Sequence, residues 1–206
     1  MGKRKQRPTR LSDPRLIPSW IGIVLFWLVG QLPWNMLLAT GRGVGHLGWH
    51  LVKKRRHIAL TNIRLCFPEL SREEQEALAK RSVISTGEAI LEMAGSFSNH
   101  RINLDKRLTI TGMEHIEKAQ AEGRGVLLLG MHFNSLDVGS RLLGYGVDFH
   151  GVYRPNDNPV IDRLINKGRS NYMASSVKRS DIRQMVRLLK NGQILWYAPD
   201  QDYGIA

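Results

Sequence analysis

The chain has 206 residues, a formal net charge of +12 and a single cysteine. This length accommodates one substantial α/β domain, alone or after a membrane-attached segment. The single cysteine excludes an intrachain disulfide and a cysteine-based zinc site, so the chain needs no oxidising compartment. The positive charge indicates an anionic partner, either a nucleic acid, an acidic membrane surface, a phosphorylated substrate or an acidic carrier protein.

The amino-terminal part of the chain combines a basic tail with an apolar segment. The tail covers residues 1–15, and residues 16–41 contain no ionisable side chain. Residues 20–29 are hydrophobic all round, which argues against a helix with one wet face. We therefore predict an N-terminal membrane helix within a membrane-associated segment at 16–41; a buried core helix is the alternative. Pro33 either kinks one span or separates two helices that lie partly in the membrane.

The next region, residues 42–104, is predicted to be helical and close to the membrane. Its basic residues, which include the run at 53–56, add attraction to an anionic leaflet. A short helix is expected over 55–65, followed by Cys66 as a small packing residue. Ser71-Arg-Glu-Glu74 is a capping box, in which the serine and the glutamate satisfy backbone donors at the start of a second helix that extends to about residue 94.

Residues 105–206 alternate between strand and helix patterns. Such alternation predicts crossover units on a mainly parallel sheet with flanking helices, and we interpret this region as an α/β catalytic domain. No helix follows the last strand to cover its face, so we expect that a C-terminal part is missing from the sequence. The predicted strands are 108–111, 125–129, 147–153 and 193–197, and the predicted helices are 113–121, 135–143, 159–167 and 181–190.

His132 and Asp137 follow the buried strand predicted at 125–129, where the chain enters a loop. Chemistry in open α/β sheets gathers at the carboxyl ends of strands, and imidazole has the side-chain pKa nearest physiological pH. The pair therefore predicts removal of a proton from a hydroxyl. His100 and Asp105 have the same spacing, but their polar surroundings favour a solvated linker.

Several ordered motifs resemble a known family. The block 126–137 looks like the His-x4-Asp/Glu motif of the glycerolipid and lipid A acyltransferases. Together with the apolar segment, the other motifs resemble the late lipid A acyltransferases, especially the lauroyl and palmitoleoyl transferases that act on Kdo2-lipid IVA. The further motifs are at 62–69, 112–116, 151–159 and 196–204.

The resemblance implies a fold like that of the glycerolipid acyltransferases and a specific reaction. A fatty acyl group, laurate in our prediction, would pass from acyl carrier protein to a hydroxyl of a lipid A precursor. The donor would be acyl-phosphopantetheine on the carrier, and no bound cofactor or metal is expected. The implied location is the cytoplasmic side of the inner membrane of a Gram-negative bacterium. The expected partners are acyl carrier protein, the lipid A precursor and inner-membrane lipids, without nucleic acid.

The resemblance also implies roles for individual residues. His132 would be the general base and Asp137 its partner, although many relatives have glutamate at the second position. Arg154 and Arg169 would contact phosphate, phosphopantetheine or developing charge, and Asp200 would position one of these arginines. We expect direct attack of the lipid hydroxyl on the thioester, with an acyl-enzyme on Ser135 as the competing mechanism.

Two other functions stay open at this point. A glycerolipid-phosphate acyltransferase shares the His-x4-Asp chemistry, although its phosphate-recognition signatures are not obvious in the sequence. A basic membrane-anchored binding protein, for example for nucleic acid, would explain the charge without catalysis. The interleaved aromatic and basic residues used by single-strand binders are not evident.

Overall fold

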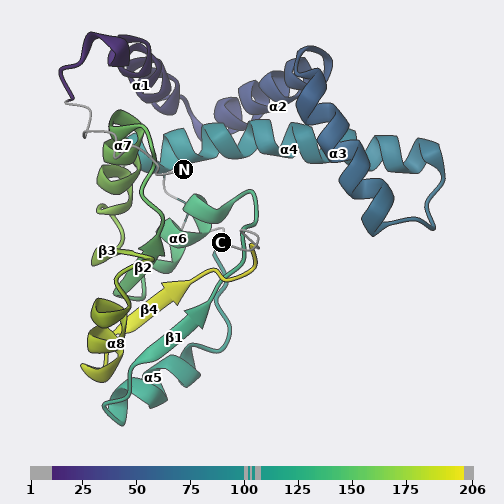
Figure 1. The fold of residues 1–206 in the computed structure, drawn as a ribbon. Coiled ribbons are helices and arrows are strands. Elements are labelled where there is room, and N and C mark those ends of the chain that lie inside the picture. Colours follow the sequence, from purple (N-terminus) through teal and green to yellow (C-terminus); the bar gives the residue numbers. More distant parts are fainter. Residues whose placement is uncertain (1–10, 100–101, 103, 105–107, 202–206) are drawn as a thin grey trace, which may run out of the picture. The chain divides into compact units, whose positions relative to one another are not determined.

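The computed structural model describes residues 11–99, 102, 104 and 108–201 (Figure 1). The chain divides into two compact units, which we describe separately. The first consists of Met1–Leu25, Asn103–His132 and Gly139–Ala206, and the second of Phe26–Ile102 and Phe133–Val138. His100 and Asp105, the second pair with His-x4-Asp spacing, lie outside the described residues.

The first unit contains a four-stranded parallel sheet. Its strands are β1 (Val126–Leu129), β2 (Phe149–Tyr153), β3 (Ser175–Lys178) and β4 (Ile194–Tyr197), in the order β1-β4-β2-β3. This sheet confirms the predicted α/β fold class.

One predicted strand is absent from the structure, and one strand of the structure was not predicted. Residues 108–111 are not a strand, although their alternating Leu-Thr-Ile-Thr pattern suits one. The strand that was not predicted is β3, whose Ser-Ser-Val-Lys sequence has only one strongly apolar residue. Val177 is fully buried, so tertiary pairing with β2 outweighs the weak local signal at this strand.

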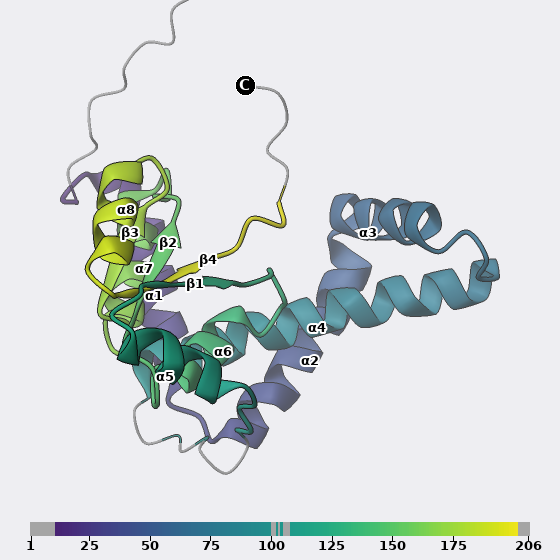
Figure 2. The same cartoon turned by 90° about the horizontal axis from the view of Figure 1, so that it is seen from below.

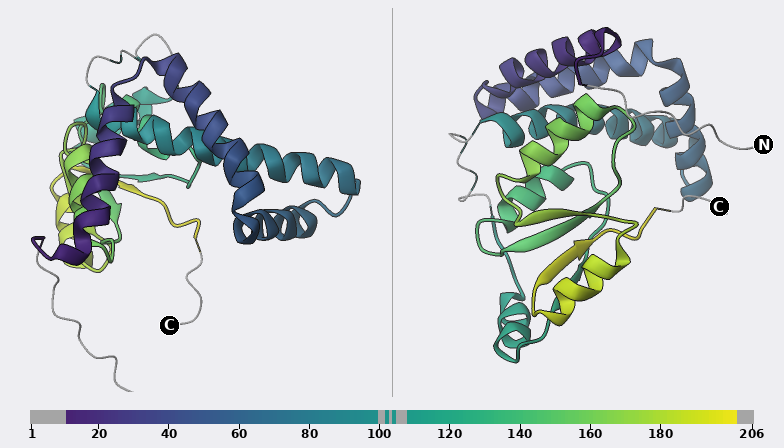
Figure 3. Two further views of the ribbon diagram at one scale, coloured as in Figure 1. Left: turned by 90° about the horizontal axis from the view of Figure 1, so that it is seen from above. Right: turned by 60° about the vertical axis from the view of Figure 1, so that its left-hand side comes forward.

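The helices of this unit begin and end within two residues of their predicted bounds. They are α5 (Met113–Ala121), α7 (Pro159–Arg169) and α8 (Ile182–Lys190), joined by α6 (Leu136–Leu143), whose first residues belong to the second unit. The crossover from β3 to β4 runs back across the sheet, opposite in direction to the β2–β3 crossover. Because such connections are right-handed, α7 and α8 cover opposite faces of the sheet (Figure 3).

The main hydrophobic cluster of the first unit lies on one face of this sheet, and Leu195 and Val177 are buried on the other face. Val126, Ile194 and Phe149 occupy the same register position on three strands, and Phe149 is completely buried. Val147 and Met173 complete this cluster from the segments that enter β2 and β3. Each such side chain contributes about 1.5–3 kcal/mol by leaving water, which fixes the strands in their register.

The amino-terminal segment is helical but divided. After a 3-10 turn at Pro14–Leu16, α1 (Ile17–Gly30) ends before Pro33, and α2 (Trp34–Leu51) begins directly after it. Proline has no N–H to continue the helical ladder, and its ring disfavours a helical residue before it. Of the two outcomes that Pro33 left open, one kinked helix or two helices, the structure has two helices. None of the helices within the described residues has both the length and the apolar character needed to cross a bilayer.

The second unit is a helical assembly in which α2 packs closely on α4 (Arg72–Ser98), and α3 (Lys53–Cys66) folds back beside α4 (Figure 2). Glycines allow the close approach of α2 and α4. A Cβ atom added at Gly41 or Gly45 would come within 3 Å of the α4 backbone, and one at Gly87 would meet both of these glycines. Glycine lowers helix propensity, yet at position 87 it is required for the packing of α4 on α2.

Two local predictions in this unit have different outcomes. The capping box is confirmed, because the Ser71 hydroxyl accepts from Glu74 N and the Glu74 carboxylate accepts from Ser71 N. Hydrogen bonding of the Glu74 carboxylate to the Ser71 side chain, and then to the Ser71 backbone N–H, holds the pKa of Glu74 below its ordinary value. The packing role predicted for Cys66 is wrong, because it is the last residue of α3 and is exposed.

Candidate active site

Strand register determines which residues meet at the carboxyl edge of the sheet. In the β1–β4 ladder Val126 pairs with Ile194 and Leu129 with Tyr197. The same register, continued by three residues beyond both strands, sets His132 opposite Asp200. The two residues are 68 positions apart in the chain, yet the parallel pairing brings them together.

The loop that leads to His132 is held by backbone and ring contacts. Gly130 N donates to Tyr197 O at 2.8 Å and extends the ladder by one residue. A Cβ atom at Gly130 would come within 3 Å of the Trp196 indole ring, so only glycine fits at this point. Trp196 therefore supports the chain just before it turns toward His132.

The carboxylate of Asp200 binds His132 twice. His132 N donates to Asp200 Oδ2 at 2.8 Å, and His132 Nδ1 lies 2.7 Å from Asp200 Oδ1. These bonds, led by the backbone donor, lower the pKa of Asp200. Asp200 is consequently ionised near neutral pH and only accepts hydrogen bonds, so the neutral imidazole carries its proton on Nδ1.

This tautomer leaves the other ring nitrogen of His132 as a base. Nε2 then bears a lone pair, and it has no hydrogen-bond partner among the described residues. About a third of each side chain is exposed, 34% for His132 and 31% for Asp200, so a substrate has access to the ring. A carboxylate that fixes the tautomer and favours the developing imidazolium is the arrangement used in hydrolase triads.

Asp137, the partner predicted from the sequence, lies in the first turn of α6 and belongs to the second unit. Its pairing with His132 stays a prediction. Ser135, the alternative nucleophile, is exposed and directly precedes α6. Next to it, Asn134 Nδ2 donates to Ser85 Oγ at 2.9 Å, which ties this part of the loop to α4 within the second unit.

The two predicted arginines lie at opposite edges of the sheet. Arg154 directly follows β2 at the carboxyl edge, half exposed and 3.7 Å from Asp157. The β2–β4 register places it level with Pro199, next to Asp200. Arg169 ends α7, shortly before the chain re-enters the sheet at the amino end of β3. Asp200 is predicted to position an arginine, but in the structure its carboxylate accepts hydrogen bonds from His132.

The sequence contained one unused signal for the His132–Asp200 contact. Each of these residues comes three positions after the end of a strand, at Leu129 and Tyr197 respectively. Two residues at the same distance beyond their strands meet only if the two strands are adjacent and their ends are level. A single sequence does not reveal the strand order. No group of three or more His, Cys, Asp or Glu suited to a metal ion is found in the described part of the chain.

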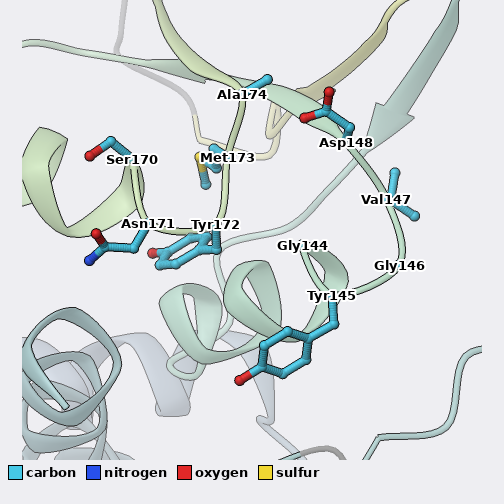
Figure 4. A pocket seen from close by; sticks show the side chains of 10 residues that line it. All are labelled: Gly144, Tyr145, Gly146, Val147, Asp148, Ser170, Asn171, Tyr172, Met173 and Ala174. Carbon is cyan, nitrogen blue, oxygen red and sulfur yellow. The ribbon is translucent and has the colours of Figure 1, made fainter. Parts of the chain in front are cut away.

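The opposite edge of the sheet holds a second histidine. His150 Nδ1 lies 2.8 Å from Ser175 Oγ, and its Nε2 lies 3.5 Å from Gln193 Oε1, so the ring links β2 with β3 and with the residue before β4. An open depression of about 400 Å³ at this edge is lined by residues 144–148 and 170–174 (Figure 4). The lining residues come directly before β2 and β3 in the chain, so the depression lies at the amino ends of these strands. His132 and Asp200 lie beyond the carboxyl ends.

Comparison with known proteins decides the family. The model of the bacterial lipid A biosynthesis acyltransferases matches residues 4–206, nearly the whole chain. The chain belongs to this family. The predicted resemblance is thereby confirmed, including the likeness to lauroyl and palmitoleoyl transferases.

Individual relatives of this chain are similar along the same length. The lipid A biosynthesis lauroyltransferase of Escherichia coli is 41% identical over 198 residues, which cover 95% of this chain and 64% of the relative. The palmitoleoyltransferase of Escherichia coli is 35% identical, with 93% and 62% covered. A lipid A biosynthesis acyltransferase of Haemophilus influenzae is 36% identical, with 93% and 61% covered. The chain thus spans a little under two thirds of these relatives.

Proposed function

We propose that the protein containing this chain transfers a fatty acyl group, laurate, from acyl carrier protein to a hydroxyl of Kdo2-lipid IVA. The single observation that supports this most strongly is His132, held by Asp200 in the tautomer that makes Nε2 a base, at the edge of a parallel sheet. Laurate is proposed because the lauroyltransferase shares 41% identity with the chain, against 35% for the palmitoleoyltransferase.

The proposed reaction proceeds by direct transfer. His132 Nε2 takes the proton of the lipid hydroxyl while the oxygen attacks the thioester carbonyl carbon. The tetrahedral intermediate then collapses, the carbon–sulfur bond breaks, and the imidazolium returns the proton to the leaving thiolate. A positioned base of this kind contributes typically 10²–10⁴-fold in rate. Asp200 stabilises the imidazolium in the interval between the two proton transfers.

Other charged residues have supporting roles in the proposal. Asp137 acts as a second acidic group near the base, as its place in the His-x4-Asp motif implies. Arg154 suits contact with a phosphate or with developing charge, because it emerges at the strand end next to Asp200. Arg169 is assigned a phosphate or phosphopantetheine contact, and donors near it would stabilise the oxyanion. Removal of one such donor elsewhere costs about 2.7–4 kcal/mol.

The charge and the apolar surface support the proposed partners and location. A net charge of +12 suits an acidic carrier protein and a phosphorylated lipid acceptor. Ile17, Ile21, Val24, Leu25 and Leu28 on α1 are each more than half exposed. Exposed apolar surface of this extent is typical of membrane contact. These features support the location implied by the family, which we propose to be the cytoplasmic side of the inner membrane of a Gram-negative bacterium.

The test is an acyl-transfer assay with the protein that contains this chain. It is incubated with lauroyl acyl carrier protein and, in separate reactions, lipid IVA bearing two Kdo sugars or glycerol 3-phosphate. Mass spectrometry should detect a new laurate ester on the first acceptor only. Ester on glycerol 3-phosphate alone would select a glycerolipid acyltransferase, and no ester on either acceptor would contradict the proposal.

Two variants separate the mechanisms. Ser135→Ala should keep transfer within about threefold of the unmodified protein, because direct attack does not use the hydroxyl. If Ser135→Ala abolishes transfer while the protein stays folded, an acyl-enzyme on Ser135 replaces the direct route. Palmitoleoyl and myristoyl carrier proteins, assayed in parallel, test the acyl preference. One methylene changes binding by only about 1–3 kcal/mol, so the ratios of kcat/KM are the useful measure.

A further inference from the structure

Helix α8 presents a strongly basic stripe to solvent. At 100° per residue, Arg183, Arg187 and Lys190 project within a sector about 60° wide. All three are exposed, and within the described residues none of them has a carboxylate at ion-pair distance. The helix itself contains no acidic residue, since Asp181 precedes it as the N-cap. Three like charges on adjacent turns repel one another unless an anionic partner lies over them.

The apolar residues of α8 are arranged around this stripe in two groups. Met185, Leu188 and Leu189 lie on the side that packs against β4 and are partly buried. Ile182 and Val186 lie between that side and the stripe, and they are 59% and 45% exposed. The outer surface of α8 therefore offers two aliphatic side chains flanked by three cations.

We infer that the outer surface of α8 is the docking surface for the acidic carrier protein that delivers the acyl thioester. This inference rests on the proposed function. Carboxylates of the carrier would pair with Arg183, Arg187 and Lys190, and a small apolar contact would form on Ile182 and Val186. Charge pairing of this kind steers encounter and sets orientation more than it adds affinity, which suits a carrier that must leave after each transfer.

The place of α8 in the first unit supports this assignment. The helix follows the carboxyl end of β3 and precedes the amino end of β4. Its first turn, with Arg183, thus lies near the sheet edge that presents His132 and Asp200. A carrier seated on α8 would hold its flexible phosphopantetheine arm beside the edge where the thioester has to react.

A protein partner suits this surface better than a lipid surface does. Amphipathic helices that bind membranes insert a continuous apolar face, commonly with tryptophan or phenylalanine. The larger apolar face of α8 is already packed on the sheet, and the helix has no aromatic residue. By contrast, α1 has no charged residue and exposes Trp20 and Trp27, which are 38% and 51% accessible. Membrane contact is therefore better assigned to α1.

The test compares charge reversal on α8 with charge reversal elsewhere on the same unit. Arg187→Glu should raise the KM for lauroyl carrier protein about five- to tenfold, with kcat changed less than twofold. Lys118→Glu, an exposed control on α5 with the same change in charge, should leave that KM within twofold. The ratio of the rate with lauroyl carrier protein to the rate with carrier-free lauroyl phosphopantetheine should also fall in Arg187→Glu.

Carrier binding is also measured directly, by titration of the carrier protein onto each variant, so that turnover is not required. Weaker binding in Arg187→Glu and Arg183→Glu, with Lys118→Glu unaffected, would support the inference even if the proposed acceptor were wrong. Equal weakening in all three variants would overturn it, because net charge alone would then be responsible. Unchanged carrier binding, with loss of binding to phosphatidylglycerol vesicles, would assign the stripe to lipid instead.

Discussion

His132 and His150 lie at opposite edges of one sheet, and the comparison shows what makes a histidine chemically useful. Both bind an oxygen through Nδ1, at 2.7 Å in His132 and 2.8 Å in His150. His150 lies within a strand, and its second nitrogen faces Gln193. His132 lies in a loop beyond its strand, with a carboxylate behind the ring and Nε2 without a partner among the described residues. A loop at a strand end can be both anchored and accessible.

The largest effect should come from replacing each histidine in turn. His132→Ala should reduce acyl transfer by about 10²–10⁴-fold, because the base is lost. His150→Ala should reduce transfer less than about fivefold and lower the free energy of unfolding by about 1 kcal/mol, the contribution of a typical hydrogen bond. Initial rates and thermal unfolding of both variants provide the check. If both variants fold and lose the same amount of activity, the claim that only the carboxyl edge of the sheet carries the base is wrong.

Replacement of the carboxylate should have the next largest effect. Asp200→Asn keeps the shape of the side chain but removes its charge, so the Nδ1–H tautomer and the imidazolium lose their support. We expect kcat to fall about 10–100-fold, the range found for groups that orient histidines at metal sites. In the His132→Ala background, Asp200→Asn should cause little further loss, because the two residues act as a unit. Additive losses in the double variant would indicate separate roles.

A smaller effect should follow from disturbing the support of the loop. Gly130→Ala pushes a methyl group into Trp196, and we expect a loss of about 1–3 kcal/mol in unfolding free energy and about tenfold in transfer. The control is Gly139→Ala in α6, where nothing lies within 4 Å of the added carbon. That change should leave activity intact and add up to about 1 kcal/mol of stability. The comparison fails if Gly130→Ala is as active as Gly139→Ala.

Local signals in the sequence predicted most of the fold of the first unit. Helix α5 was predicted residue for residue, and α7 and α8 begin with Asn158 and Asp181 as caps whose side chains accept backbone N–H groups. These elements depend on neighbours within a few positions. Strand β3 depends on pairing with β2, and the break at Pro33 left two outcomes open in the sequence, of which the structure has two helices.

The sequence pattern predicted His132, and the family resemblance named Asp200 but assigned it to an arginine. His132 was found because an apolar strand precedes it, whereas the partner inferred for it was the carboxylate nearest in sequence, Asp137. Asp200 accepts hydrogen bonds from His132, and only the β1–β4 register brings these two residues together. The glycines between α2 and α4 also depend on tertiary contacts. The packing role of Gly87 exists only because Gly41 and Gly45 lie opposite it.

The central claim is that Asp200 holds His132 with its proton on Nδ1 and leaves Nε2 as the base. The most direct measurement is nitrogen NMR of the ring nitrogens of His132 in protein labelled with ¹⁵N-histidine, at a pH where the imidazole is neutral, with His132→Gln used to assign the signal among the seven histidines. The account predicts a protonated Nδ1 and an unprotonated Nε2, with this preference lost in Asp200→Asn. A protonated Nε2 in the unmodified protein would contradict it.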